Sequence, residues 1–92
     1  MRIEFKPSFD RSIKALKSQD KEEIKSIIGD LIDILSMDRP LHEGLGLKRL
    51  RGSYWEVRKG IKDRILFRWQ KDLVEFILAG DHEDIKRFLR CI

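Results

Sequence analysis

The chain has 92 residues, of which 41% are hydrophobic and 39% are charged. That length accommodates one domain, and the balance allows one modest core beneath a heavily charged surface, which excludes intrinsic disorder. The apolar runs are too short to span a membrane, and the N-terminal residues Met1–Lys6 lack the apolar centre of a secretion signal. We therefore expect one cytoplasmic domain with no membrane association.

The net charge of +4 is distributed unevenly along the chain. Between positions 48 and 68, eight Lys or Arg residues accompany only two acidic ones, Glu56 and Asp63. The eight cations are Lys48, Arg49, Arg51, Arg58, Lys59, Lys62, Arg64 and Arg68. A local excess of this kind attracts phosphate groups more strongly than the mean charge suggests. Cys91 is the single cysteine, so an internal disulfide framework is excluded.

The first 40 residues predict a strand followed by two helices. Alternation of apolar and charged residues over Met1–Phe5 is typical of a short half-buried strand, which Pro7 ends. Ser8 is a candidate N-cap for a first helix with one apolar face. The segment 20–23 resembles a capping box with Asp20 as the cap, and the apolar residues after it recur at helical spacing until Pro40.

The second half predicts a meander of three strands and a final helix. Residues 41–51 are expected to form a loop because they include two glycines and a basic run. The expected strands are 54–59, 64–69 and 73–79, separated by a turn over 60–63 and a tight hairpin over 70–72. Asp81 is a candidate cap for the last helix.

These elements predict an α+β domain of order β-α-α-β-β-β-α. The antiparallel sheet would pack one face against the N-terminal helical hairpin, with the first strand joining it at the side. The opposite face would be partly open and would display Glu56, Arg58, Arg64 and Arg68.

The residue types exclude several chemistries. His42, His82 and Cys91 lack the spacing of a metal site, and we expect no cofactor. Glycine-rich phosphate loops and nucleophile elbows are missing from the sequence. Any catalysis would therefore depend on acid–base groups and cationic stabilisation. Cleavage of RNA through its own 2′-hydroxyl suits this inventory, because it needs a base, a cation beside the phosphorus and a proton donor to the leaving oxygen.

Each candidate residue also has a simpler structural interpretation. Arg64 is the first candidate for phosphate stabilisation, but arginines on strands are more often solvated or paired, here with Glu56 or Asp63, and Arg58 has the same two interpretations. His82 follows the cap of the last helix, where the dipole favours a neutral ring, yet surface histidines are common there. Lys86, one turn further on, would ordinarily be solvated.

The central segment resembles the RelE/ParE superfamily of toxins from prokaryotic toxin–antitoxin systems. The shared pattern is a basic loop containing Leu, an aromatic-x-Val-Arg strand, a Gly turn, and an Arg followed by three apolar residues. In this chain the pattern corresponds to residues 48–52, Trp55–Arg58, Gly60 and Arg64–Phe67. Together with the element order, the resemblance covers nearly the whole chain.

The resemblance implies two possible targets. RelE-like members cleave messenger RNA in the ribosomal A site, whereas ParE-like members bind and poison DNA gyrase. Both kinds are held inactive by a cognate antitoxin protein, so ribosome and mRNA, or alternatively gyrase, are the implied partners together with that antitoxin. A third possibility is a catalytically inactive homologue that only binds its antitoxin.

The resemblance also implies roles for individual residues. Arg64, Arg58, His82 and Lys86 fall at positions that serve catalysis in the nuclease members. The implied RNA-binding residues are Lys48, Arg49, Arg51, Lys62 and Arg68. Glu56 stands where many members have a cation, and it favours the gyrase alternative because an acid weakens phosphate binding. The primary expectation is a ribosome-dependent, metal-independent endoribonuclease that inhibits translation.

Overall fold

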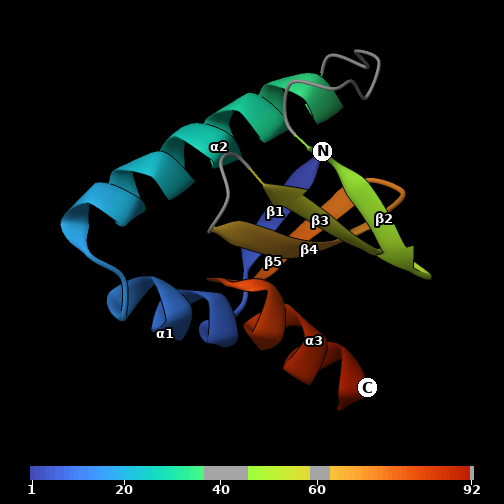
Figure 1. Cartoon of the computed structure of the whole chain (residues 1–92). Coiled ribbons are helices and arrows are strands. Elements are labelled where there is room, and N and C mark those ends of the chain that lie inside the picture. The colour runs from blue at the N-terminus through green and yellow to red at the C-terminus, as the bar shows by residue number, and fades with distance from the viewer. Residues whose placement is uncertain (37–45, 59–62, 92) are drawn as a thin grey trace.

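The computed structural model describes residues 1–36, 46–58 and 63–91, which form an α+β domain (Figure 1). In chain order the elements are β1 (Arg2–Phe5), α1 (Pro7–Lys14), α2 (Ser18–Ser36), β2 (Lys48–Arg51), β3 (Tyr54–Arg58), β4 (Arg64–Gln70), β5 (Leu73–Gly80) and α3 (His82–Arg90). The five strands form one sheet in the order β1-β5-β4-β3-β2. The predicted α+β class and the packing of the sheet against an N-terminal helical hairpin are confirmed.

The sheet is mixed because β1 pairs in parallel with β5 at one edge, while the other neighbours pair antiparallel. The predicted meander and the side position of the first strand are therefore confirmed. Between β4 and β5 the register shifts by one residue, since Leu66 pairs with Leu78 whereas Phe67 pairs with Phe76. Ile77 is the extra residue on β5, as in a β-bulge.

The predicted loop over residues 41–51 was wrong in its last four residues. Lys48–Arg51 forms β2, which pairs antiparallel with β3 and adds a strand to the meander. Three of its four residues are exposed and charged, so the strand shows no apolar alternation in the sequence. Charges and an irregular register are common on edge strands because they discourage pairing with other chains. The described order is therefore β-α-α-β-β-β-β-α, and His42 lies outside the described residues.

Two predicted helix starts also need correction. Helix α1 begins at Pro7 with Lys6 as its N-cap, and proline suits this position because its fixed φ and missing N–H cost nothing there. The Ser8 hydroxyl instead donates a hydrogen bond to the Ile77 carbonyl, which ties α1 to β5. Helix α2 begins at Ser18, so Asp20 lies inside its first turn and is not its cap.

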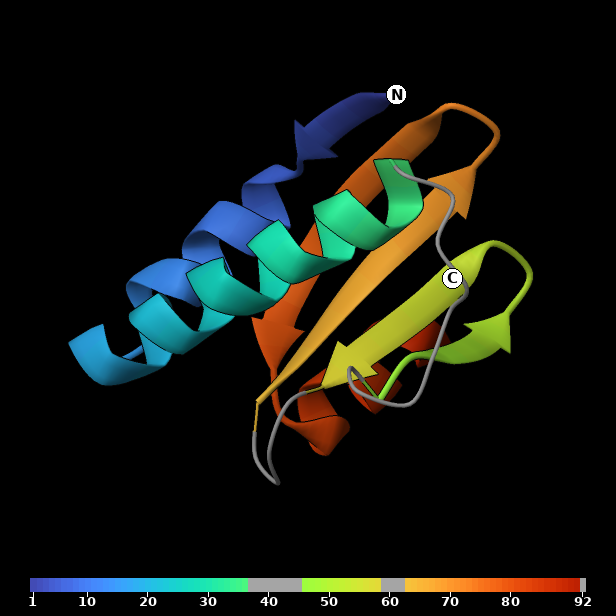
Figure 2. The same ribbon diagram turned by 90° about the horizontal axis from the view of Figure 1, so that it is seen from above.

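The main core lies between the helical hairpin and one face of the sheet. Figure 2 shows from above how the hairpin lies over that face. Its buried members are Phe9, Ile24, Ile27, Leu31, Ile34, Val57, Ile65, Phe67, Val74, Phe76 and Ala79. Each fully buried aliphatic or phenyl side chain contributes about 1.5–3 kcal/mol relative to exposure. Trp55 and Trp69 pack at the margin of this core, on the apolar side predicted for them.

The opposite face of the sheet is more covered than predicted. Helix α3 packs on it, and Ile85 joins Leu66 and Ile77 in a second apolar cluster. Glu56, expected on an open surface, is only 5% exposed. The candidate site lies at the end of this face near the start of β4. In the described part of the chain, no helix is long and apolar enough to cross a membrane.

Candidate active site

Three side chains of complementary chemistry meet beside the start of β4. The Nη1 atom of Arg64 donates a hydrogen bond to Oε1 of Glu56 over 3.1 Å. The same Nη1 lies 2.9 Å from Nδ1 of His82. Because a guanidinium can only donate, Nδ1 of His82 must be the acceptor, which places the proton of a neutral ring on Nε2. A cation, a carboxylate and an imidazole thus share one site.

Strand pairing brings these three residues together from distant parts of the sequence. Arg64 opens β4 and pairs with Arg58 on β3 and with Gly80 on β5. Glu56 lies two residues before Arg58, so its side chain projects from the same face of the sheet. His82 follows Gly80 by two residues and starts α3. Because β5 ends beside the start of β4, the His82 imidazole lies next to Arg64.

A capping box fixes the first turn of α3, and with it His82. The Asp81 carboxylate accepts a hydrogen bond from the backbone N–H of Asp84 over 2.9 Å, and the Asp84 carboxylate accepts one from the backbone N–H of Asp81 over 3.0 Å. The hydrogen bond from the Asp84 backbone lowers the pKa of Asp81. The predicted cap at Asp81 is confirmed. Gly80 is needed beside it, since a Cβ there would lie 2.5 Å from Oδ2 of Asp84.

The three side chains line a cavity of about 520 Å³, together with Gly46, Leu47, Lys48 and Arg58. Three of the seven lining residues are Lys or Arg, and Glu56 is the sole carboxylate among them. Gly46 approaches the Arg58 backbone so closely that a Cβ would lie 2.9 Å from its carbonyl oxygen. Its φ of 58° also favours glycine. The cavity is therefore cationic and suited to an anion.

Arg64 is held in a largely buried position. Its side chain is 16% exposed, and that of Glu56 is 7% exposed. Its Nε is buried and finds no hydrogen-bond partner among the described residues. Taking charges out of water is costly unless they are paired, so Glu56 is required to keep the guanidinium in this place. The predicted salt bridge to Glu56 is therefore present, and Arg64 also lines the cavity. Its role in phosphate stabilisation stays a prediction.

The structure brings together only part of the predicted set. Arg64, Arg58, His82 and Lys48 line the cavity, whereas Lys86 lies one turn along α3 with its Nζ 4.0 Å from Glu83. Arg49, Arg51 and Arg68, which were also predicted to bind RNA, do not line it. Arg49 donates a hydrogen bond to the Gly52 carbonyl, and Arg51 is exposed at the end of β2. The Arg68 guanidinium lies 3.9 Å from the Glu75 carboxylate and 6.0 Å from the centre of the Tyr54 ring. Lys62 falls outside the described residues.

Glu56 was predicted on an open surface, and its burial is a correction to that prediction. We expected an acid on an open sheet face to weaken phosphate binding, but the carboxylate is buried and accepts a hydrogen bond from Arg64. The sequence did contain a signal that Glu56 and Arg64 share one face of the sheet. Glu56 alternates with the core residue Val57, and its strand pairs with the strand that begins at Arg64. Whether that face was exposed depended on α3, which is distant in sequence.

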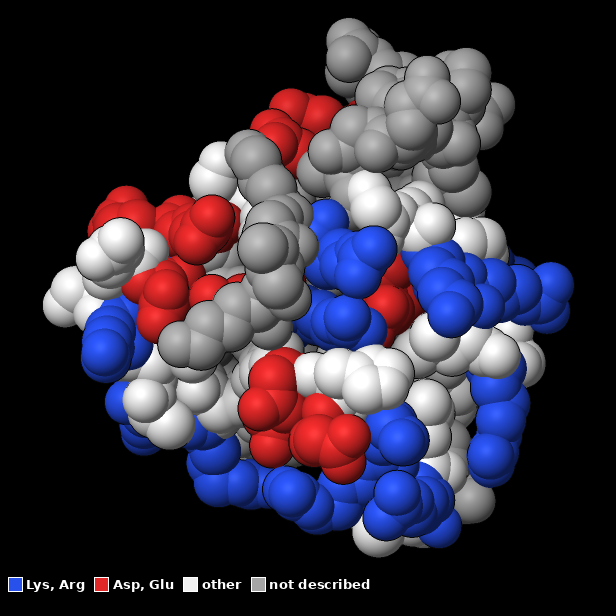
Figure 3. All heavy atoms as spheres, in the orientation of Figure 1, with Lys and Arg blue, Asp and Glu red and all other residues white. Residues whose placement is uncertain are grey.

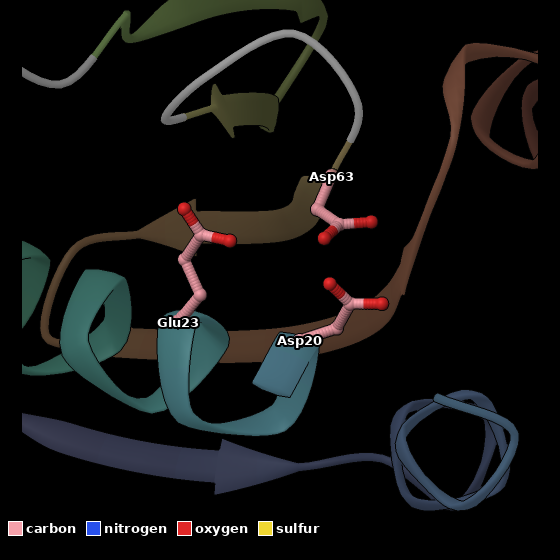
Figure 4. A group of neighbouring side chains, drawn as sticks. All are labelled: Asp20, Glu23 and Asp63. Atoms are coloured by element: carbon pink, nitrogen blue, oxygen red, sulfur yellow. The ribbon is translucent and has the colours of Figure 1, made fainter. Parts of the chain in front are cut away.

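A second group of titratable side chains lies on the other side of the Arg64 backbone. The carboxylates of Asp20, Glu23 and Asp63 all lie within 4.8 Å of one another, and Figure 4 shows them pointing toward a common centre from α2 and from the residue before β4. Asp63 is 9% exposed. Acidic groups gather in this way without binding an ion, so the group by itself does not define a metal site. The sequence did not indicate this group, because Asp63 is 40 or more residues from Asp20 and Glu23.

Comparison with known proteins identifies the fold. The sequence matches no family profile and no curated protein. Among solved structures, the RelB–RelE antitoxin–toxin complex from Methanococcus jannaschii contains a chain that is 21% identical, with a TM-score of 0.68 over 92% of this chain and 96% of that one. This chain has the RelE toxin fold.

Two further complexes agree with this RelE-like fold. The E. coli DinJ–YafQ complex aligns at 18% identity and a TM-score of 0.70, covering 92% of this chain and 98% of the other. The RelBE2 toxin–antitoxin complex from Mycobacterium tuberculosis aligns at 17% identity and a TM-score of 0.66, covering 88% and 96%. The resemblance expected from the sequence is thus confirmed for the fold. At these identities the activity must be argued from the site itself.

Proposed function

We propose that this chain is the toxin of a type II toxin–antitoxin module and that it cleaves messenger RNA through the 2′-hydroxyl of the RNA itself. The observation that carries the proposal is the meeting of Arg64, Glu56 and His82 in one cationic cavity. The RelE-like fold supports the same conclusion, because the solved neighbours are toxins of toxin–antitoxin pairs.

The three groups match the needs of the reaction. Glu56 accepts the proton of the 2′-hydroxyl, and the 2′-oxygen then attacks the adjacent phosphorus. Arg64 directs its guanidinium donors at the phosphorane oxygens, where negative charge develops. The bond from phosphorus to the 5′-oxygen breaks, and protonated His82 gives its proton to that oxygen. The products are a 2′,3′-cyclic phosphate and a free 5′-hydroxyl, and bulk water returns both catalytic groups to their starting states.

Binding of a phosphate would rearrange the resting site. In the resting arrangement Arg64 is shared between Glu56 and His82. An entering phosphodiester competes for the guanidinium, since charge-assisted bonds from arginine to phosphate are strong and often bidentate. Turning Arg64 toward the phosphate frees Nδ1 of His82 to take up a proton. Arg58 and Lys48 line the same cavity and would neutralise the neighbouring phosphate charge.

The position of Glu56 changes the balance between the two targets. An exposed acid at this position would favour gyrase as the target, because it would weaken phosphate binding. Glu56 is instead a buried partner of Arg64, where its carboxylate can serve acid–base chemistry. Gyrase inhibition and a catalytically inactive, antitoxin-binding chain are therefore the outcomes expected if the cleavage test fails. We expect the ribosome with its mRNA to present the substrate.

We also propose a cognate antitoxin as the partner. A groove of about 570 Å³ lies between α1 and α2 beside the end of β1, with the 47% exposed Phe5 among its apolar residues. Its charged lining residues are three lysines and one acid: Lys14, Lys21, Lys25 and Asp10. This combination fits an apolar segment flanked by acidic residues. Coexpression with such an antitoxin should restore growth, and Lys21→Glu with Lys25→Glu should weaken the rescue. Unchanged rescue would place the antitoxin elsewhere.

The chemistry has a direct test in the ends of its products. RNA cut by this mechanism carries a 2′,3′-cyclic phosphate, which mass spectrometry distinguishes from a 3′-hydroxyl. Replacing the 2′-hydroxyl by hydrogen at the cleaved position should stop the reaction. Cleavage that continues on such a substrate would exclude the 2′-hydroxyl as the nucleophile.

A further inference from the structure

A row of cations continues from the cavity along the outer face of α3. His82, Lys86 and Arg90 are spaced four residues apart, so they lie on one side of the helix. All three are exposed. At a rise of about 1.5 Å per residue, Lys86 lies about 6 Å and Arg90 about 12 Å along the axis from His82. The row therefore begins at the candidate active site and leads away from it.

The two cations of this row are weakly engaged within the protein. The Lys86 ammonium lies 4.0 Å from Glu83, and both side chains are about half or more exposed, at 47% and 66%. An exposed pair of this kind contributes little, about 0–1 kcal/mol. Arg90 forms no salt bridge with any described residue. Arg87, in contrast, lies 3.4 Å from Asp84 and belongs to the capping network.

The helix that carries the row is anchored on its other side. Ile85 is 2% exposed and packs on Leu66 and Ile77, with Phe88 and Leu89 beside it. Lys86 and Arg90 take no part in this packing, so they can contact a ligand without disturbing the fold. Figure 3 shows Lys and Arg side chains along the lower edge of the molecule, with Asp and Glu side chains over the start of α3.

We propose that the substrate RNA strand leaves the cavity along α3, and that Lys86 and Arg90 each contact one phosphodiester flanking the cleaved one. This inference rests on the proposed ribonuclease function and assigns Lys86 to substrate binding instead of catalysis. The contacts involve only the backbone of a single strand, so they would add affinity without base preference.

The test uses RNA that binds but cannot be cut. RNA oligonucleotides carrying 2′-O-methyl groups lack the nucleophilic hydroxyl, and fluorescence anisotropy measures their binding across a range of salt concentrations. A trinucleotide fills only the cavity, whereas a decanucleotide also reaches α3. The variant is Lys86→Gln with Arg90→Gln. The matched control, Lys17→Gln with Lys71→Gln, removes the same charge from exposed positions before α2 and between β4 and β5.

The expected result is specific to the longer RNA. Each lost phosphate contact to single-stranded RNA reduces the slope of log affinity against log salt concentration by about 0.7. With the decanucleotide, the slope of the double variant should therefore be smaller than that of the parent by about 1.4. It should bind the trinucleotide as the parent does, and the control should match the parent with both.

Three results would overturn the inference: an unchanged slope with the decanucleotide, an equal fall in the control, or failure of the parent to bind either RNA. The function itself is tested separately, by cleavage of an unmodified message. A parent that shows the expected binding pattern but cuts nothing would contradict the ribonuclease and leave the row on α3 in place.

Discussion

The Nη1 atom of Arg64 lies 2.9 Å from Nδ1 of His82, across a gap of 18 residues in sequence. Arginine is always a donor, so this contact exists only while Nδ1 of the imidazole carries no proton. We predict that the folded protein holds His82 as the Nε2–H tautomer at alkaline pH. Long-range proton–nitrogen NMR of the imidazole rings tests this, with Arg64→Ala as the comparison. A dominant Nδ1–H form in the parent would contradict the hydrogen bond.

Glu56 should matter for stability as well as for activity. Glu56→Ala leaves the guanidinium of Arg64 largely buried and without its carboxylate, and an unsatisfied buried group costs about 1–3 kcal/mol. Chemical denaturation should show this loss. Glu4→Ala is the matched control, because Glu4 pairs with Arg2 at 3.5 Å on the surface and should change stability by at most about 1 kcal/mol. Equal effects in both variants would mean that Glu56 does not hold Arg64.

Two glycines should respond to alanine in opposite directions. In Gly80→Ala the new Cβ would lie 2.5 Å from Oδ2 of Asp84, so the capping box must open, which costs about 1 kcal/mol. Gly29 lies in α2, where a Cβ meets nothing within 4 Å, so Gly29→Ala should stabilise the protein by about 1 kcal/mol. Thermal unfolding measures both. Stabilisation by Gly80→Ala would show that the start of α3 is not constrained as described.

The capping box also predicts a dependence on acidity. The pKa of Asp81 is lowered from 3.8, chiefly by the hydrogen bond from the Asp84 backbone. The folded state therefore favours the ionised carboxylate. The cap contributes fully above pH 3.8 and is lost as the pH falls through the lowered pKa. Backbone amide signals of the first turn of α3 should shift in that acidic range, and Asp81→Ala should remove the transition. A transition that persists in Asp81→Ala would assign it to another group.

The sequence predicted most of the fold because the apolar periodicity is strong where the core is large. The repeat from Ile24 to Leu35 and the apolar strand from Leu73 became α2 and β5 with small changes at their ends. Strand β2 was missed because its pairing is made by the backbone, while its side chains are exposed cations. The bulge at Ile77 was missed for a related reason, since register depends on the partner strand.

The candidate site was only partly predictable. Arg64, Arg58 and His82, which the sequence predicted as site residues, line one cavity. Alternation along the strands and the cap of α3 are local signals, so the sequence could point to these three. The burial of Glu56 was not visible, because it depends on how α3 packs across β4 and β5. The separation of Lys86 from the cavity likewise depends on the direction in which α3 leaves the sheet.

The central claim is that Arg64, Glu56 and His82 cut RNA, and primer extension on a reporter message in a cell-free translation reaction tests it most directly. The account predicts cuts at ribosome-occupied codons with the parent protein, none with Arg64→Ala, and a large loss with Glu56→Gln. Glu4→Gln should cut like the parent. Intact message with a folded parent protein, or undiminished cutting by Arg64→Ala, would contradict the account.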